Sequence, residues 1–428
     1  MQALLSYDQS PPIAAPFRFF LTAPVFAILA GALLLWGGPD ALASRWTPDV
    51  LAVTHLITVG FMLQVMLGAL IQVLPVVAGA NLRQPMRLAA AVHVALNVGA
   101  LVLGSAFLTF DERWFKGAAI ILGAGTMLFL VAAFLALRGI PATSASIKGL
   151  KHALIGLGAA VGIGVALTTS LGWSLGLPLL PLADIHLVWG FVGWGLVLLA
   201  AVAYVVVPMF QITPAYPASF ERWFSLTTLA IVGVWTAVEH FELDAARLLL
   251  GVGVAAVVAA FAVITLRLQR ASKRARFDAS QHCWRVAMLS ALGACGVWLL
   301  AMLLPAVGEW SGWPLLCGVL LLFGGFTTVI VGMLYKIVPF LIWLHLQNAG
   351  ARGVLAPNMK KIIAERAMDR QVQAHFAACA LVLAAACWPT WFVYPAGVGL
   401  IVANAWLLRN LWSGVAVYRA HLRKMAAA

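Results

Sequence analysis

The chain has 428 residues, of which 63% are hydrophobic and only 10% are charged. A water-soluble fold could not bury that much apolar surface, so the composition indicates a polytopic membrane protein. The formal net charge is +13, but a nucleic-acid-binding protein would need a soluble basic domain, and this chain lacks one. We therefore attribute the charge to membrane topology and to contact with anionic membrane lipid, with no nucleic-acid partner.

Apolar runs of about 18 residues or more predict transmembrane helices. Twelve runs qualify, which predicts an all-α polytopic membrane protein with 12 transmembrane helices. The predicted spans are 17–36, 49–77, 87–108, 117–138, 150–172, 185–212, 222–240, 244–267, 285–305, 314–345, 373–392 and 394–413.

The basic residues predict the orientation of these spans. If the N-terminus is cytoplasmic, the predicted outer loops contain only four of the 27 Lys and Arg, namely Arg45, Arg113, Lys116 and Arg247. Nearly all the others fall in inner loops or at inner helix ends, including the stretches at 267–276 and 352–370. This asymmetry predicts a multi-pass protein of a bacterial-type inner membrane with both termini in the cytoplasm.

Three prolines recur at nearly equal intervals. Pro75, Pro208 and Pro339 lie in "IQVLPVV", "YVVVPMF" and "YKIVPFL", near the inner ends of the second, sixth and tenth predicted spans. Their separations of 133 and 131 residues each cover four spans. The spacing predicts three pseudo-symmetric four-helix units within a single membrane domain of residues 1–428. The units are expected at about 17–138, 150–267 and 285–413.

Small residues share this register, because Gly68, Ala201 and Gly332 each lie seven residues before their proline. A small side chain lets a neighbouring helix approach closely. The alternative interpretation is that the three prolines only mark helix ends near the inner boundary.

Three histidines lie toward the outer ends of predicted spans: His55, His186 and His240. A helix N-terminus disfavours the imidazolium, which keeps the ring neutral and able to bind a metal. Gly190 lies one turn after His186, and a smooth face of this kind suits either a flat macrocycle or close helix packing. The other histidines are expected to be interface residues near the cytoplasmic face, namely His93, His152, His282, His345, His375 and His421.

Lys336 lies well inside the tenth predicted span, three residues before Pro339. A lysine at the centre of a bilayer would cost about 3 kcal/mol, so this side chain must extend to the interface, face a polar cavity or find a partner. A proton or substrate path from the inner face is the functional alternative. Gln72 occupies the same position relative to Pro75.

The segment "HLITVGFMLQVMLGALIQVLP", which starts at His55, resembles the second helix of the NnrS family, and "PFRFFLTAP" at 16–24 resembles that family's entry to helix one. The chain is also similar to haem-copper oxidase subunit I, whose twelve helices form three pseudo-symmetric arcs. His55 matches a haem-ligating histidine of that family. In "HLVWGFVG", His186 and Trp189 match its sixth helix.

The resemblance implies haem, with copper as a second cofactor. His55 would be the axial ligand, and His186 or His240 would be a second haem ligand or a copper ligand, beside Trp189 and Gly190. Two departures imply that oxygen is not reduced. Gly193 stands where the oxidases have a copper-ligating histidine, and a helix-ten His-X-His would fall near Cys317 and Val319.

The implied roles are electron transfer, a response to nitric oxide stress, or supply of metal or haem to respiratory enzymes, with a respiratory-chain or electron-donor protein as partner. Two other classes stay open at this point. One is a transporter or permease for copper or a small solute, and the other is an assembly factor with no cofactor. Whether the protein is an enzyme is not predicted.

Overall fold

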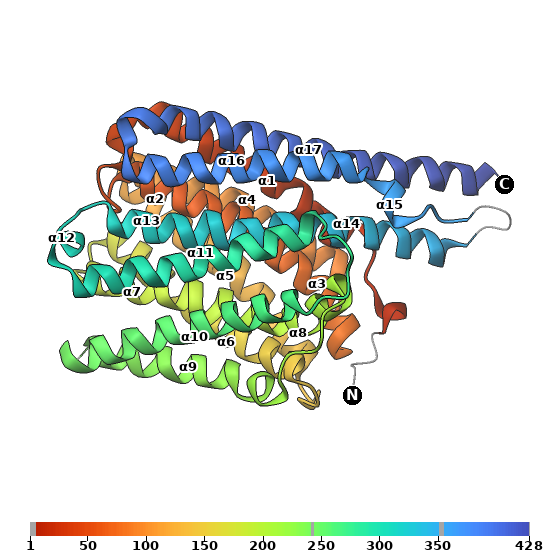
Figure 1. The fold of residues 1–428 in the computed structure, drawn as a ribbon, viewed down its shortest axis with the longest axis horizontal. Coiled ribbons are helices and arrows are strands. Elements are labelled where there is room, and N and C mark those ends of the chain that lie inside the picture. Colours follow the sequence, from red (N-terminus) through yellow and green to blue (C-terminus); the bar gives the residue numbers. More distant parts are fainter. Residues whose placement is uncertain (1–5, 241–243, 351–354, 428) are drawn as a thin grey trace. The chain divides into compact units, whose positions relative to one another are not determined.

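The computed structural model describes residues 6–240, 244–350 and 355–427 (Figure 1). Helices account for its regular structure, and no strand occurs in these residues. Eleven helical segments in the described residues are long and apolar enough to cross a membrane. The chain is therefore an all-α, multi-pass membrane protein, as its composition predicts.

Three of these eleven spans are composite, because an eight-residue π-helix interrupts each of them. The spans are α1 (Ala14–Gly37), α2–η3–α3 (Pro48–His55, Leu56–Leu63 and Gln64–Ala78), α4 (Pro85–Thr109), α5 (Glu112–Leu137), α6 (Ala145–Trp173), α7–η4–α8 (Leu179–Val188, Trp189–Leu196 and Val197–Gln211), α10 (Asp244–Arg270), α11 (Ala279–Leu303), α13–η5–α14 (Trp313–Val319, Leu320–Thr327 and Thr328–Ala349), α16 (Glu365–Cys387) and α17 (Pro389–Ala427). The short elements are η1 (Tyr7–Gln9), η2 (Pro39–Leu42), α12 (Pro305–Gly308) and α15 (Met359–Ile362).

The seventh predicted span, 222–240, forms helix α9 (Ala218–His240), which is not among the eleven. Arg222, Glu239 and several Ser and Thr residues lower its mean hydropathy below that of the other spans. It packs beside α10, as Figure 1 shows.

The π-helices follow the predicted three-fold repeat. Each of η3, η4 and η5 ends twelve residues before its proline. The prolines lie inside helices rather than after them, and α14 continues for ten residues beyond Pro339. A proline that merely ended each helix would not explain a π-helix at a constant distance before it. The three units therefore share a distortion of the backbone as well as a proline.

The first unit shows what this distortion does to packing. Gly68 and Gly60 both face α1, where a Cβ added to Gly68 would lie 2.9 Å from Phe19 Cβ and one added to Gly60 would collide with the ring of Phe26. The two glycines are eight residues apart, but their partners on the regular helix α1 are seven apart. A π-turn closes one residue later than an α-turn, so it absorbs the extra residue and keeps both glycines on one face.

The other two units repeat this arrangement. In each, a glycine inside the π-helix and a small residue eight positions later face residues seven apart on a neighbouring helix. The pairs are Gly193 with Gly156 and Ala201 with Gly149 on α6, and Gly324 with Ser290 and Gly332 with Cys283 on α11. The prediction that Gly68, Ala201 and Gly332 permit close helix approach is thus confirmed in all three units.

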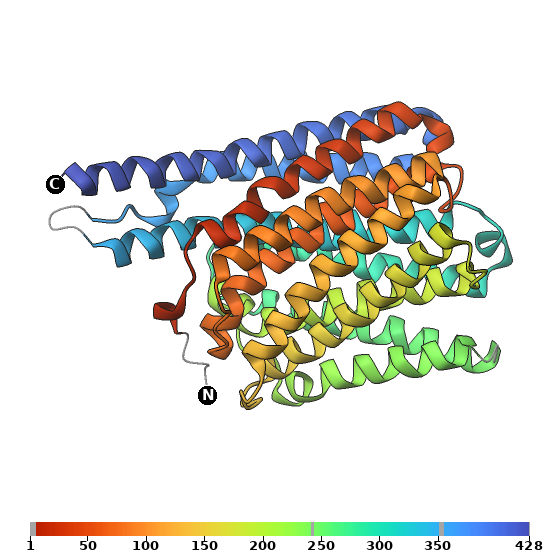
Figure 2. The same cartoon turned by 180° about the vertical axis from the view of Figure 1, so that it is seen from behind.

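The contacts divide the chain into two compact units that cut across the three-fold repeat. Unit 1 holds the described residues of Met1–Pro11, Leu70–Ala275 and Ala291–Leu299, and unit 2 holds those of Pro12–Ala69, Arg276–Ser290 and Leu300–Ala428. Within unit 1, α4, α5 and α6 pack in sequence, and α6 also packs against η4 and α8. Within unit 2, α17 packs along both α1 and α16, as Figures 1 and 2 show. The single membrane domain stays a prediction.

Candidate functional site

His55 lies at the junction between α2 and the first π-helix, in unit 2. Thr47 caps the start of α2 by accepting a hydrogen bond from the Val50 amide, at 3.3 Å. The ring is half-buried, and its Nδ1 lies 2.7 Å from the carbonyl oxygen of Leu51. A carbonyl can only accept, so Nδ1 carries the proton and Nε2 carries the lone pair. This is the tautomer that an Nε2 metal ligand requires.

His186 lies on α7, three residues before the second π-helix, in unit 1. Its Nδ1 donates to the carbonyl oxygen of Ala160 on α6, at 2.9 Å. The ring packs directly on α6, because a Cβ added to Gly164 would lie 2.9 Å from its Cε1 atom. One turn further on, a Cβ added to Gly190 would meet no atom within 4 Å. The backbone of α6 therefore orients this imidazole, and the helix face below it is open.

Trp189 contacts α9. Its indole Nε1 donates to Thr236 Oγ1 on that helix, at 3.0 Å, and its ring lies against Gly193. His186 instead contacts α6, and a shared role of the two side chains in cofactor binding stays a prediction.

The side chain of His240 lies outside the described residues, although its backbone ends α9. Among the side chains that are described, no group of three or more His, Cys, Asp or Glu is placed to hold a metal ion. The metal ligands predicted at His55, His186 and His240 therefore stay a prediction. Haem binding requires only one or two axial ligands from the protein.

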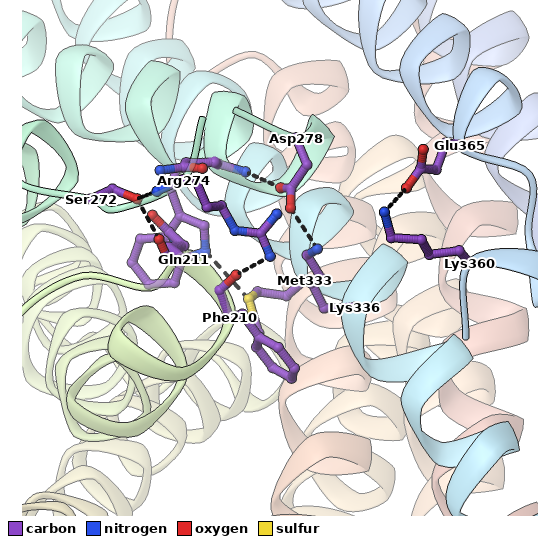
Figure 3. Close-up of polar contacts among 11 residues, drawn as sticks. Phe210, Gln211, Ser272, Arg274, Asp278, Met333, Lys336, Lys360 and Glu365 are labelled. Atoms are coloured by element: carbon purple, nitrogen blue, oxygen red, sulfur yellow. Dashed lines mark hydrogen bonds and ion pairs between the residues drawn. The ribbon is translucent and has the colours of Figure 1, made fainter. Parts of the chain in front are cut away.

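Lys336 has a partner. Its Nζ lies 2.7 Å from Asp278 Oδ2, and the two side chains are 22% and 28% exposed. Figure 3 shows the two groups pointing toward each other. The other carboxylate oxygen of Asp278 accepts from the amide of Gln281, at 3.0 Å, and so caps the N-terminus of α11. Of the three alternatives for this lysine, the structure selects an ion pair.

Cys317 lies on α13 as a half-buried, reduced thiol. It is 22 residues before Pro339, and His186 is 22 residues before Pro208. Cys317 is therefore the counterpart of His186 in the third repeat. The third-repeat position equivalent to His55 is Val319. The third repeat therefore has no histidine at either of these two positions.

Part of the basic stretch at 267–276 has a structural role in unit 1. Arg274 Nη2 donates to the carbonyl oxygen of Phe210, at 2.8 Å, and Ser272 Oγ donates to that of Gln211, at 2.6 Å (Figure 3). These carbonyls belong to the last turn of α8, where a helix leaves its acceptors unpaired. The stretch thus caps α8, a role that charge counting alone does not reveal.

A buried polar cluster in unit 2, formed by His375, Cys379 and Thr328, was not predicted from the sequence. His375 Nε2 lies 2.9 Å from Thr328 Oγ1 and 3.5 Å from Cys379 Sγ. His375 is only 3% exposed, so its ring is buried among helices instead of lying at the protein surface. The predicted span began at 373, whereas α16 begins at Glu365 and carries His375 about 15 Å along its axis. The repeat of polar residues four apart, at Gln371, His375 and Cys379, was the available signal.

No protein-family model matches the chain, and no curated protein sequence matches it.

Proposed function

We propose that the protein is a haem-binding membrane protein with the architecture of haem-copper oxidase subunit I, related to the NnrS family, that does not reduce oxygen. Its roles would be electron transfer, a response to nitric oxide stress, or supply of haem or metal to respiratory enzymes. A respiratory-chain or electron-donor protein would be its partner. The distribution of Lys and Arg supports a bacterial-type inner membrane with cytoplasmic termini and contacts to anionic lipid.

One observation carries this proposal. His55 and His186 both lie within three residues of a π-helix in equivalent repeats, and each ring donates through Nδ1 to a backbone carbonyl. π-helices are rare and often occur at functional sites. A backbone acceptor on Nδ1 orients a ligating imidazole and makes Nε2 the ligand atom. The open face at Gly190 supports a flat ligand beside His186.

In this proposal the chain binds and orients the group, and haem itself supplies the one-electron chemistry and the affinity for nitric oxide. His55 would hold the haem iron through Nε2, and the apolar spans around it would exclude water. Copper, held by His186 or His240, stays the second cofactor of this proposal.

The test is an absorption spectrum of protein purified in detergent from cells with adequate haem supply. We expect a Soret band that is lost or shifted in His55→Ala. A colourless wild-type protein would rule out the haem proposal.

A transporter is the second candidate, and the ion pair and buried polar residues of unit 2 favour it. Copper accumulation in cells with and without the gene tests this alternative. Equal accumulation would count against copper transport.

A further inference from the structure

Among the described residues of unit 2, buried polar atoms without a hydrogen-bond partner include Ser280 Oγ on α11, and Gln371 Oε1 and His375 Nδ1 on α16. Their residues are 2%, 0% and 3% exposed. Buried polar groups are nearly always satisfied, and the requirement is stricter inside a membrane, where lipid offers no partner. Internal water is the ordinary way to satisfy such atoms.

Two of these residues lie near charged side chains. Ser280 follows Asp278 by two residues in the first turn of α11, and Asp278 pairs with Lys336. Asp369, an exposed residue two positions before Gln371 on α16, interacts electrostatically with both Asp278 and His282. Carboxylates raise the local concentration of cations, including protons.

Further polar side chains extend from these charged groups into unit 2. Cys283, one turn beyond Ser280, interacts electrostatically with Asp278 and with Cys379. Tyr335 on α14 interacts with Cys283, and its hydroxyl accepts from Asn410 Nδ2 on α17, at 2.9 Å. On α16, Gln371, His375 and Cys379 follow one another at single-turn spacing.

His375 offers a proton acceptor among these polar side chains. Thr328 donates its hydroxyl proton to the carbonyl oxygen of Phe323, at 2.8 Å, so its oxygen accepts from His375. Nε2 of the imidazole is therefore protonated, and Nδ1 carries the lone pair. That Nδ1 atom is the buried atom without a partner. Phe323 lies in η5, so the third π-helix supplies the carbonyl that fixes this arrangement.

We propose that unit 2 contains a hydrated proton path that runs from the Lys336 and Asp278 ion pair to His375. A proton enters from bulk water at the ion pair and is passed along internal waters, with one O–H bond breaking as the next forms. It ends as an N–H bond on Nδ1, and the imidazole becomes an imidazolium. The return of the proton reverses each step, so no oxidant or other reactant is required. The path does not depend on haem.

Native cysteines allow a direct test, because Cys283 and Cys379 lie on the path. Cys295 is the matched control, since it lies on the same helix as Cys283 but directs its thiol to the carbonyl of Ala255 on α10, at 3.6 Å. Three variants would each keep one of these thiols and replace the other four cysteines with serine. In proteoliposomes, Ag⁺ is added to one side at a time, and unreacted thiol is then counted with a maleimide after denaturation.

We expect Ag⁺ to react with Cys283 and Cys379 at least tenfold faster than with Cys295, and only from the side that bears Lys336. Equal rates for the three thiols, or equal rates from both sides, would overturn the proposal. Asp278→Asn should slow the reaction of Cys379 severalfold, because asparagine still caps a helix but carries no charge. Asp111→Asn, at the cap of α5, should leave the rate unchanged.

Proton binding itself requires a second measurement. His375→Gln keeps an N–H donor for Thr328 near the position of Nε2 but removes the titratable ring. Infrared difference spectra recorded across a pH titration should show an imidazole band in the wild type that is lost in His375→Gln and retained in His345→Gln. If the band persists in His375→Gln, the path does not end at this residue. Neither readout uses the Soret band, so the path and the haem proposal can fail separately.

Discussion

Lys336 Nζ lies 2.7 Å from Asp278 Oδ2 and so joins the third proline-containing span to the capped start of α11. Lys336→Met would leave this carboxylate without its cation. Removing one partner of a buried pair costs about 3–5 kcal/mol, and the partial exposure of both groups reduces the expected loss to about 1–2 kcal/mol. Thermal unfolding in detergent should show a lower Tm.

Lys360→Met is the control for this prediction. Lys360 also forms an ion pair, with Glu365 at 3.2 Å, but these side chains are 77% and 61% exposed. Exposed pairs contribute little, so the Tm should hardly change. Equal losses of Tm in the two variants would show that the partly buried Lys336 pair contributes no more to stability than the exposed Lys360 pair.

The close contact between Gly156 and the η4 backbone leads us to predict that a larger residue at position 156 destabilises the protein. A Cβ at position 156 would collide with the carbonyl oxygen of Gly193, which cannot move as a side chain can. Gly156→Ala should therefore destabilise the protein by about 1–3 kcal/mol, the usual cost of overpacking. Gly162→Ala on the same helix meets no atom within 4 Å and should be neutral or slightly stabilising, because alanine favours helix. Thermal unfolding of both variants gives the comparison.

The π-helix at η5 predicts an unusual tolerance to deletion. Gly324 and Gly332 are eight residues apart but match residues seven apart on α11. Removing Gly325 would leave seven residues, which a regular α-helix accommodates without losing either contact. The variant should remain folded and monodisperse on size-exclusion chromatography in detergent.

Deletion of Ile337 provides the comparison. It is half-buried like Gly325, but it lies beyond η5, so the rest of α14 would rotate by about 100°. That rotation would remove Leu341 and Ile342 from their buried positions. Aggregation should follow. If the two deletions behave alike, η5 does not contain an extra residue that can be removed without loss of the helix contacts.

The haem proposal predicts different outcomes for two histidines with the same local bond. His55 and His345 both donate through Nδ1 to the carbonyl four residues earlier, at 2.7 and 2.9 Å. Alanine at either position removes that bond, but only His55→Ala should abolish or shift the Soret band. His186→Ala should change it if this residue supplies the second ligand. An unchanged spectrum in both His55→Ala and His186→Ala would exclude them as ligands.

The sequence determined the membrane class, the approximate positions of eleven spans and the regular spacing of the three prolines. Long apolar runs have few alternatives in a bilayer, and a recurrent proline with a small residue seven positions earlier leaves a visible period. Lys336 also stood out, because a charge inside an apolar run is costly wherever the helix packs.

Only the tertiary structure decided which side chains meet. The partner of Lys336 is 58 residues away on another element, and the partner of Trp189 is Thr236, 47 residues away on α9. The cluster of His375, Cys379 and Thr328 joins two helices whose relative rotation no local pattern specifies. The π-helices were equally hidden, because the extra residue in each becomes apparent only against the seven-residue spacing of the helix beside it.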